Sequence, residues 1–333
     1  TYRFSDVNYA TRSEDEQESF FQRYCKCLNS FDCTFKITVN NKNKDMDVLR
    51  NEVMLKYRND GFDKMRESYN RIIEEKILEG RQGIEQERYL TITNERKNFE
   101  EAKAQFATIE ASMFRSFAEL GSKLTPLTGN ERLKILHDYY RLGREDEFNF
   151  DIRQGRITGT DFRNEICNTR IKYHPDYFED EGKVGRVLFI KKYPTYLSDR
   201  FFTELTFLPV HSVTSVDVVP VPKDLTMKML QKKYLGIESD IIKQQRTRNR
   251  NNDFSSDISY ATRQKKKDIE EIMNNVREND ESLYYVSVTM IVMADDRDEL
   301  QSICETVDSI AKGAGCAVDT CMYKQREAVN TTL

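Results

Sequence analysis

The chain has 333 residues, of which 38% are hydrophobic and 32% are charged, and this suits a helix-rich globular protein of two ordinary domains. The 52 basic and 56 acidic residues are mixed along the sequence and leave a net charge of -4, so the whole molecule is not an obvious binder of polyanions. No apolar run approaches the roughly 20 residues of a membrane-spanning helix, so we expect no direct insertion into a bilayer.

The first half of the sequence alternates between strand and helix patterns. The predicted elements are a strand at 33–41, a helix at 45–78, a strand from residue 89, a helix at 98–121, an edge strand at 122–128 and a helix at 129–143. The helix at 98–121 has the clearest pattern, because its apolar residues recur at steps of three and four. Asn98 and Glu101 resemble a capping box at its start, and Gly121 supplies its end.

The second half repeats this order. The predicted elements are strands at 183–194 and 213–222, a helix at 223–234, a two-helix hairpin at about 237–280, a strand at 282–294, a helix at 295–315, a strand at 316–323 and a helix from residue 324. The run SLYYVSVTMIVMA at 282–294 is apolar on both alternating faces. This pattern is typical of a strand buried in the middle of a sheet.

The repeated order predicts an internal duplication. Strand, helix, strand, helix, strand is most of a split βαβ or ferredoxin-like unit, an open sheet with helices on one face. We therefore predict an α+β fold of two tandem ferredoxin-like halves with long projecting helices, at 1–146 and 183–333, joined by a connector at 147–182 without sustained periodicity. The segments 89–142 and 283–333 are expected to superpose.

The sequence lacks the common catalytic motifs. It contains no G-x-x-x-x-G-K-[ST] loop, no G-x-G-x-x-G and no G-x-S-x-G. The three histidines, His137, His174 and His211, each stand alone in their segments, so a histidine-based site would need long-range convergence. We therefore predict no catalytic residues, no bound cofactor and no ATP hydrolysis in this chain.

The cysteines are interpreted as structural thiols. Cys25, Cys27 and Cys33 form the one cluster that invites a metal, but their spacing is not that of a zinc site and no histidine lies nearby in the sequence. Seven cysteines without a secretory leader favour a reducing compartment and free thiols.

Two groups of residues are candidates for contact with partners. The first group is basic and lies in the predicted hairpin: Arg246, Arg248, Arg250, Lys265, Lys266 and Lys267. Such a cluster could hold an acidic protein, anionic lipid or nucleic acid, but it could also be a solvated helix surface, and no aromatic residues interleave with it as in a single-strand binder. The second group is aromatic: Tyr173, Tyr177, Phe178, Tyr193, Tyr196, Phe201 and Phe202. These rings could anchor a partner or could pack the two halves together.

Several phrases of the sequence together resemble a known family. They are FSDVNYA, QESFFQRYCKCLNSFD, RYLTITNERKNFEEAKAQF, IKYHPDYFEDEGKVGRVLFIKKYPTYLSDRFFTEL and CMYKQREAVNTTL. They are similar to the N-terminal portion of the large conjugal-transfer ATPases of type IV secretion systems, in the form found in conjugative elements of Gram-positive bacteria. The last phrase resembles the helix that precedes the motor domain in that family.

The resemblance implies a role in assembly. We expect the chain to be a segment of a longer polypeptide whose ATPase domain, with ATP and Mg²⁺, follows Leu333. The segment itself would be a non-catalytic module that self-associates and docks on other subunits of the inner-membrane complex for DNA transfer. It would be cytoplasmic and held at the inner face of the cell membrane through these partners.

The alternative is a free-standing nucleic-acid-binding adaptor of two RRM-like units. It predicts solvent-facing aromatic residues on a sheet face. The run at 282–294 lacks that basic and aromatic signature, so nucleic acid is a possible partner but not the favoured one.

Overall fold

The computed structural model describes residues 1–9, 11–43, 54–78, 84–142, 144, 147–166, 170–250, 259–278 and 281–333. These residues fall into two compact units. The sheet unit comprises Thr1–Asn8, Phe35–Asp217 and Ser287–Leu333, and the hairpin unit comprises Tyr9–Thr34 and Val218–Val286.

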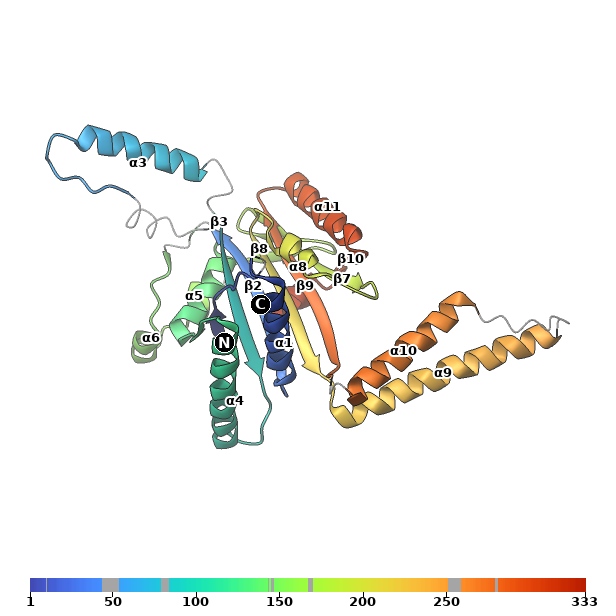
Figure 1. Cartoon of the computed structure of the whole chain (residues 1–333). Helices are drawn as coiled ribbons and strands as arrows, with labels where there is room; N and C mark the ends of the chain where they lie inside the picture. Colours follow the sequence, from blue (N-terminus) through green and yellow to red (C-terminus); the bar gives the residue numbers. More distant parts are fainter. Residues whose placement is uncertain are drawn as a thin grey trace. The chain divides into compact units, whose positions relative to one another are not determined.

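The fold is α+β, as predicted, and its strands form one ten-stranded sheet among the described residues (Figure 1). The strands are β1 (Tyr2–Phe4), β2 (Thr34–Asn43), β3 (Ile84–Thr93), β4 (Leu124–Pro126), β5 (Ile171–Tyr173), β6 (Phe178–Asp180), β7 (Lys183–Lys192), β8 (Ser212–Pro220), β9 (Tyr284–Ala294) and β10 (Ala317–Thr320). The order across the sheet is β4-β1-β3-β2-β8-β9-β7-β6-β5. Strand β10 also pairs with β7, along Leu188–Lys192, beyond the residues that pair with β6.

The strand order contains two ferredoxin-like units. In such a unit the chain runs βαββαβ, and the four strands lie in the order fourth, first, third, second. The first half gives β4-β1-β3-β2, and the second half gives β10-β7-β9-β8. The two half-sheets meet where β2 lies beside β8, so the second strand of one unit pairs with the second strand of the other.

Helices are inserted at the same place in both units. The helices of the chain are α1 (Glu14–Asn29), α3 (Asp63–Leu78), α4 (Phe99–Leu120), α5 (Gly129–Tyr140), α6 (Ile152–Thr158), α7 (Arg163–Ile166), α8 (Asp199–Thr206), α9 (Lys223–Arg250), α10 (Tyr260–Glu278), α11 (Arg297–Gly313) and α12 (Gln325–Thr332). Helix α3 lies between the second and third strands of the first unit, and α9 with α10 occupy that position in the second. The long helices of the sequence prediction are therefore insertions at one equivalent point of a duplicated unit.

The second half-sheet is covered on both faces. Side chains alternate along a strand, so Leu188 and Ile190 of β7 face one side, where they pack with α8 and α11. Val187 of β7 and Ile291 of β9 face the other side, where the core includes Tyr139 of α5 and Val329 of α12. The expectation of helices on one face is thus wrong for this half, because α5 and α12 occupy the second face.

Helix α4 forms where the sequence predicted it. The Asn98 side chain accepts a hydrogen bond from the backbone N–H of Glu101 at 2.8 Å, and Gly121 ends the helix in the left-handed conformation, with φ of 77°. Its rings pack edge-on against β1, with Phe117 5.7 Å from Phe4 between ring centroids.

The structure differs from the sequence prediction in four other places. Strand β1 and helix α1 were not expected, and the connector at 147–182 contains α6, α7, β5 and β6. Of the helix predicted at 45–78, residues 44–53 lie outside the described residues. The helix begins only at Asp63, because Asn59 and Gly61 adopt positive φ, which breaks a helix. Helix α9 runs unbroken through Gly236, since one glycine in a helix interior costs only about 1 kcal/mol.

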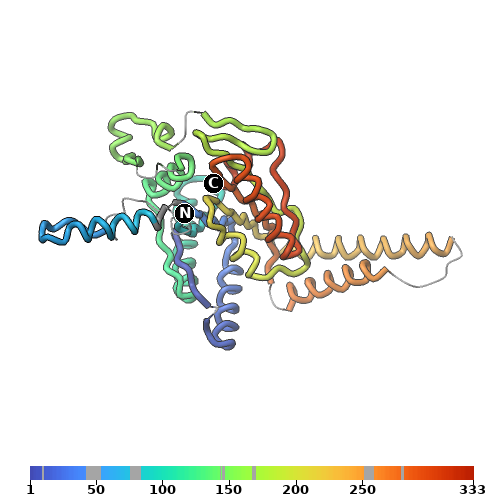
Figure 2. Tube along the Cα trace, turned by 90° about the horizontal axis from the view of Figure 1, so that it is seen from above, coloured from blue at the N-terminus to red at the C-terminus, as the bar shows by residue number. Residues whose placement is uncertain are grey.

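The hairpin unit holds α1, α9 and α10. Helices α9 and α10 lie side by side in both views (Figures 1 and 2). The Lys266 ammonium of α10 lies 3.1 Å from the Glu238 carboxylate of α9 and over the ring of Tyr234. The Tyr284 hydroxyl donates to the Leu28 carbonyl of α1 at 3.0 Å. The first two contacts join α9 to α10, and the third joins the start of β9 to α1.

Candidate interaction surfaces

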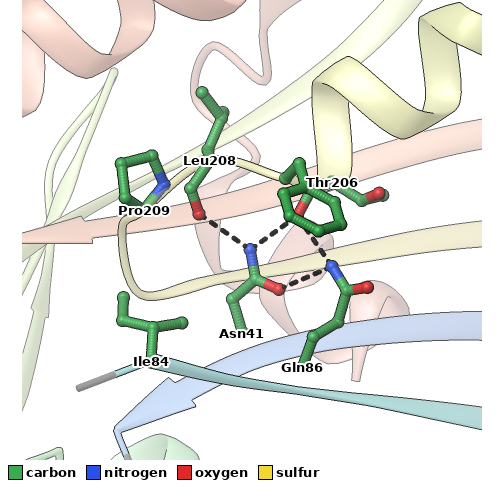
Figure 3. A pocket seen from close by; sticks show the side chains of 7 residues that line it. Asn41, Ile84, Gln86, Thr206, Leu208 and Pro209 are labelled. Carbon is green, nitrogen blue, oxygen red and sulfur yellow. Dashed lines mark hydrogen bonds between the residues drawn. The ribbon is translucent and has the colours of Figure 1, made fainter. Parts of the chain in front are cut away.

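A cavity of about 480 Å³ opens where β2, β3 and the loop from α8 to β8 meet (Figure 3). It is lined by Asn41, Ile84, Gln86, Thr206, Phe207, Leu208 and Pro209. The side-chain nitrogen of Asn41 donates to the carbonyls of Thr206 at 2.8 Å and Leu208 at 3.1 Å. The side-chain nitrogen of Gln86 donates to Asn41 Oδ1 at 3.1 Å and to the Thr206 carbonyl at 2.9 Å.

These amides tie the two ferredoxin-like units to each other. Asn41 and Gln86 belong to the first unit, and the carbonyls that they bind belong to the second. Because the amide nitrogens already donate to the protein, the cavity mainly offers the apolar side chains of Ile84, Leu208 and Pro209, with the exposed ring of Phe207. The seven lining residues include no Asp, Glu, Lys, Arg, His or Cys, and the Thr206 hydroxyl donates to the Phe202 carbonyl at 2.8 Å.

The predicted aromatic group is divided between core and surface. Tyr177, Phe178 and Phe201 are buried, and Phe202 packs against the same core as Phe201. Phe178 lies opposite Gly185 in the sheet, where its ring occupies the space that a side chain at residue 185 would need. These four rings are core residues, which corrects their assignment as contact candidates. Tyr173, Tyr193 and Tyr196 remain exposed.

A polar and aromatic cluster surrounds the turn that leads into β6. The rings of His174 and Tyr177 stack with centroids 4.2 Å apart, and the Arg297 guanidinium lies 4.4 Å from the Tyr177 ring. The Glu179 carboxylate lies 3.2 Å from His174 Nε2 and 3.1 Å from Lys172 Nζ. This cluster fixes the turn beside the exposed Tyr173.

Sequence reasoning missed two exposed side chains beside this turn. The backbone N–H of Tyr323 donates to the Pro175 carbonyl at 2.6 Å, which places Met322 and Tyr323 next to the turn. Both side chains are exposed, and Tyr323 adopts a φ of 59°, which is unusual for a residue other than glycine. They were missed because the prediction placed both residues in a strand at 316–323, whereas β10 ends at Thr320.

The predicted basic group lies at the end of the hairpin where α9 finishes and α10 starts. We call this end the hairpin tip and define it by Lys243–Arg250 and Tyr260–Lys267. Arg246, Arg250, Lys265 and Lys267 are exposed there, and Arg248 is half-buried. Lys266 instead lies in the contact between the two helices, where it binds Tyr234 and Glu238 of α9. These hydrogen bonds raise the pKa of its ammonium group. The tip as defined contains eight basic and no acidic residues.

No group of three or more His, Cys, Asp or Glu side chains is arranged to hold a metal ion within the ranges that the structure describes. Among the described helices, none is long and apolar enough to cross a membrane. Cys27 and Cys33 are buried, and Cys25 is half-buried.

Comparison with known proteins adds no assignment: no family model matches the chain, and no curated protein matches it significantly.

Proposed function

We propose that the chain is a non-catalytic assembly module at the N-terminal side of a conjugal-transfer ATPase of a type IV secretion system. In this proposal it self-associates and docks the ATPase on the inner-membrane complex for DNA transfer. ATP and Mg²⁺ would be bound by the motor domain of the parent polypeptide and not by this module. The resemblance of the sequence phrases to that family is the starting point.

The observation that carries the proposal is the concentration of exposed basic side chains at the hairpin tip, among them Arg246, Arg250, Lys265 and Lys267. The whole chain has a net charge of -4, yet the stretch 243–267 contains eight basic residues against two acidic ones, Asp253 and Asp257. Charge gathered in this way raises the association rate with an oppositely charged surface and penalises wrong partners. An acidic face on a subunit of the membrane complex is therefore the contact that we assign to the tip.

The RRM-like alternative has less support. An RRM binds single-stranded RNA on an open sheet face with aromatic side chains. In the second unit, one face packs against α8 and α11 and the other against residues of α5 and α12. In the first unit Tyr89 is a sheet aromatic, but it is buried and its hydroxyl bonds to Glu87. Tyr285 of β9 is exposed, but it lies at the start of its strand, with its hydroxyl 3.5 Å from the Met229 sulfur of α9.

Charge reversal in the parent polypeptide tests the proposal. The tip variant changes Arg246, Arg250, Lys265 and Lys267 to Glu. The control variant makes the same number of changes near the other end of the hairpin, at Lys228, Lys232, Lys233 and Arg277, which are also exposed. We expect the tip variant to lower co-fractionation with the membrane complex and DNA transfer at least tenfold, because each lost charge weakens contact with an acidic surface and the new charge repels it. The control variant should keep co-fractionation with the membrane complex and DNA transfer near the wild-type level.

Equal effects of the two variants would count against a docking role for the tip. If the parent polypeptide without residues 1–333 still reached the membrane complex and supported transfer, the assembly role as a whole would be wrong.

A further inference from the structure

The segment Met54–Glu75, which we call the α3 segment, exposes an unusual number of large apolar side chains. It includes the loop before α3 and the first three turns of that helix, all within the sheet unit. The exposed side chains are Leu55, Tyr57, Phe62, Met65, Tyr69 and Ile72. A solvated surface helix does not need six such side chains within 18 residues.

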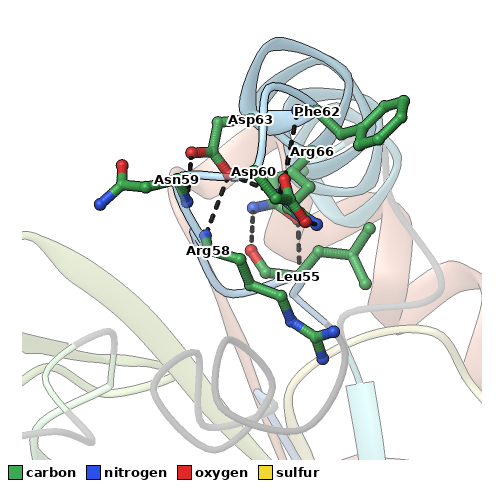
Figure 4. Close-up of polar contacts among 8 residues, drawn as sticks. Leu55, Arg58, Asn59, Asp60, Phe62, Asp63 and Arg66 are labelled. Atoms are coloured by element: carbon green, nitrogen blue, oxygen red, sulfur yellow. Dashed lines mark hydrogen bonds and ion pairs between the residues drawn. The ribbon is translucent and has the colours of Figure 1, made fainter.

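The polar side chains of the segment bind its own backbone (Figure 4). The Asp63 carboxylate accepts the N–H groups of Arg58 at 3.0 Å and Asn59 at 2.9 Å. The Asn70 side chain accepts the N–H of Leu55 at 2.9 Å and donates to its carbonyl at 3.0 Å. These bonds hold the loop against one side of α3.

Ion pairs add to this attachment. The Arg66 guanidinium lies 2.5 Å from Asp63 and also binds Asp60. The pKa of the Asp63 carboxyl is lowered, chiefly by the hydrogen bond from the Arg58 backbone and also by Arg66. The loop therefore covers the polar side of the helix, and the apolar side stays open in a fixed arrangement.

The open side has the spacing of a helix-pairing seam. Phe62, Met65, Tyr69 and Ile72 follow one another at steps of three, four and three, and their exposed fractions are 59%, 70%, 43% and 49%. This spacing keeps the side chains on one stripe of a helix and is the repeat by which two helices pack in a coiled coil. A helix of 16 residues is only marginally stable by itself, so a partner on this stripe would also stabilise α3.

The charge of the segment favours a protein partner over a lipid surface. It has five basic and five acidic residues, so it carries no net charge. A helix that lies in a membrane interface has a polar face rich in Lys and Arg, which this segment lacks. A nearly neutral stripe of Phe, Met, Tyr and Ile is instead complementary to a copy of itself.

The exposed area is sufficient for a dimer. Large side chains of this kind that are about half exposed offer roughly 100 Å² each. Six of them give about 600 Å² per copy and about 1,200 Å² for a pair, which is the lower end of specific interfaces. Two-fold pairing of identical surfaces is the commonest form of homo-oligomer.

We propose that two copies of this chain pair through the α3 segment, with Phe62, Met65, Tyr69 and Ile72 at the centre of the contact and the exposed Leu55 and Tyr57 of the attached loop beside them. This deepens the self-association that is part of the proposed function, and it can fail while docking on the membrane complex holds. The contact is distinct from the hairpin tip, because the two surfaces share no residue.

Analytical ultracentrifugation of the full chain across the micromolar range tests the pairing. The variant Met65→Glu places a carboxylate on the stripe, and Ser68→Glu places the same group beside it on the exposed polar surface. We expect Met65→Glu to weaken dimerisation at least tenfold, and Ser68→Glu to leave it within about twofold of wild type. Circular dichroism of both variants checks that the fold is kept.

A second measurement does not depend on the stability of these variants. A photo-crosslinking residue at Tyr69 should join two chains at residues 54–78 of the second copy, whereas the same residue at Glu67 should not. A monomeric wild-type chain, a Met65→Glu variant that dimerises normally, or crosslinks to any other region would overturn the proposal. Binding of the monomer to lipid vesicles that is lost in Met65→Glu would also overturn it, because the stripe would then serve a membrane.

Discussion

Gln325 shows how one side chain anchors the last helix to the sheet. It is almost completely buried, its side-chain oxygen accepts the backbone N–H of Val187 at 2.9 Å, and its side-chain nitrogen donates to the Cys321 carbonyl at 3.0 Å. Val187 is completely buried, whereas the Cys321 carbonyl also accepts the backbone N–H of Lys324 at 3.3 Å. Near it, the buried Thr332 hydroxyl donates to Thr289 of β9 at 3.1 Å.

Replacing Gln325 with Leu keeps the volume but removes both hydrogen bonds. The buried N–H of Val187 would then lack its partner, which costs about 1–3 kcal/mol. We expect the free energy of unfolding, measured by urea denaturation, to fall by this amount. Gln231→Leu, at an exposed position of α9, should change it by less than about 0.5 kcal/mol. Equal values for the two variants would contradict the anchoring role.

His211 is a buried base without a hydrogen-bond partner among the described residues. Neither of its ring nitrogens is paired, and its ring lies 6.2 Å from that of Tyr139, whose hydroxyl is also unpaired. Burial, together with a smaller effect of the positive charge of Lys183, lowers the pKa of His211 to about 4. The ring is therefore neutral in the folded chain at pH 7.

This lowered pKa predicts a loss of stability in acid. Below its ordinary pKa of about 6.5 the unfolded chain takes up a proton that the folded chain refuses until about pH 4. The free energy of unfolding should therefore fall by about 3 kcal/mol from this group as the pH drops from 6.5 to 4. In His211→Leu this part of the pH dependence should vanish, whereas His174→Gln should retain it. If the free energy of unfolding of the wild type followed the same pH dependence as that of His211→Leu, His211 would not be the source of the acid sensitivity.

At the scale of the elements, local signals in the sequence decided which predictions succeeded. Helix α4 and strand β9 were predictable, because one has a cap, a glycine stop and a clear period, and the other is a continuous apolar run. Strand β1 has three residues and β6 has three, which is too short for any period to show. The α3 segment was missed as a surface, because apolar residues at helical spacing usually face a core.

Two glycines provide a test of element packing with opposite signs. A Cβ at Gly185 in β7 would meet the Phe178 ring and would lie 2.5 Å from the Met293 sulfur, whereas a Cβ at Gly236 in α9 would meet no atom within 4 Å. We expect Gly185→Ala to lower the melting temperature through a cost of about 1–3 kcal/mol. Gly236→Ala should raise stability by about 0.5–1 kcal/mol, because alanine favours the helix. Stabilisation by Gly185→Ala would show that the sheet is less tightly packed there.

At the scale of the whole molecule, the sequence indicated the duplication but not how its halves combine. The repeated order of strands and helices predicted two similar units. Their joining at β2 and β8 could not be predicted, because edge strands pair through backbone groups that every residue has. The Asn41 and Gln86 contacts that tie the units were also invisible, since their partners are carbonyls about 120 to 170 positions away in the sequence.

Two exposed surfaces of this fold, the hairpin tip and the α3 segment, support the proposal that the chain acts in assembly. The hairpin tip offers positive charge to an acidic partner, and the α3 segment offers a neutral apolar stripe to a second copy. The two proposed contacts differ in chemistry and share no residue. The account therefore predicts that this chain localises by binding protein subunits rather than by acting on a substrate.

Fractionation of the chain, expressed by itself, tests this claim most directly. Residues 1–333 are produced in cells that contain the secretion apparatus and in matched cells from which its membrane subunits have been deleted. We expect the chain to sediment with the membranes only where those subunits are present, and the tip variant to lose this association. Equal distribution of the chain in both kinds of cell would contradict the account, whether it stayed with the membranes or apart from them.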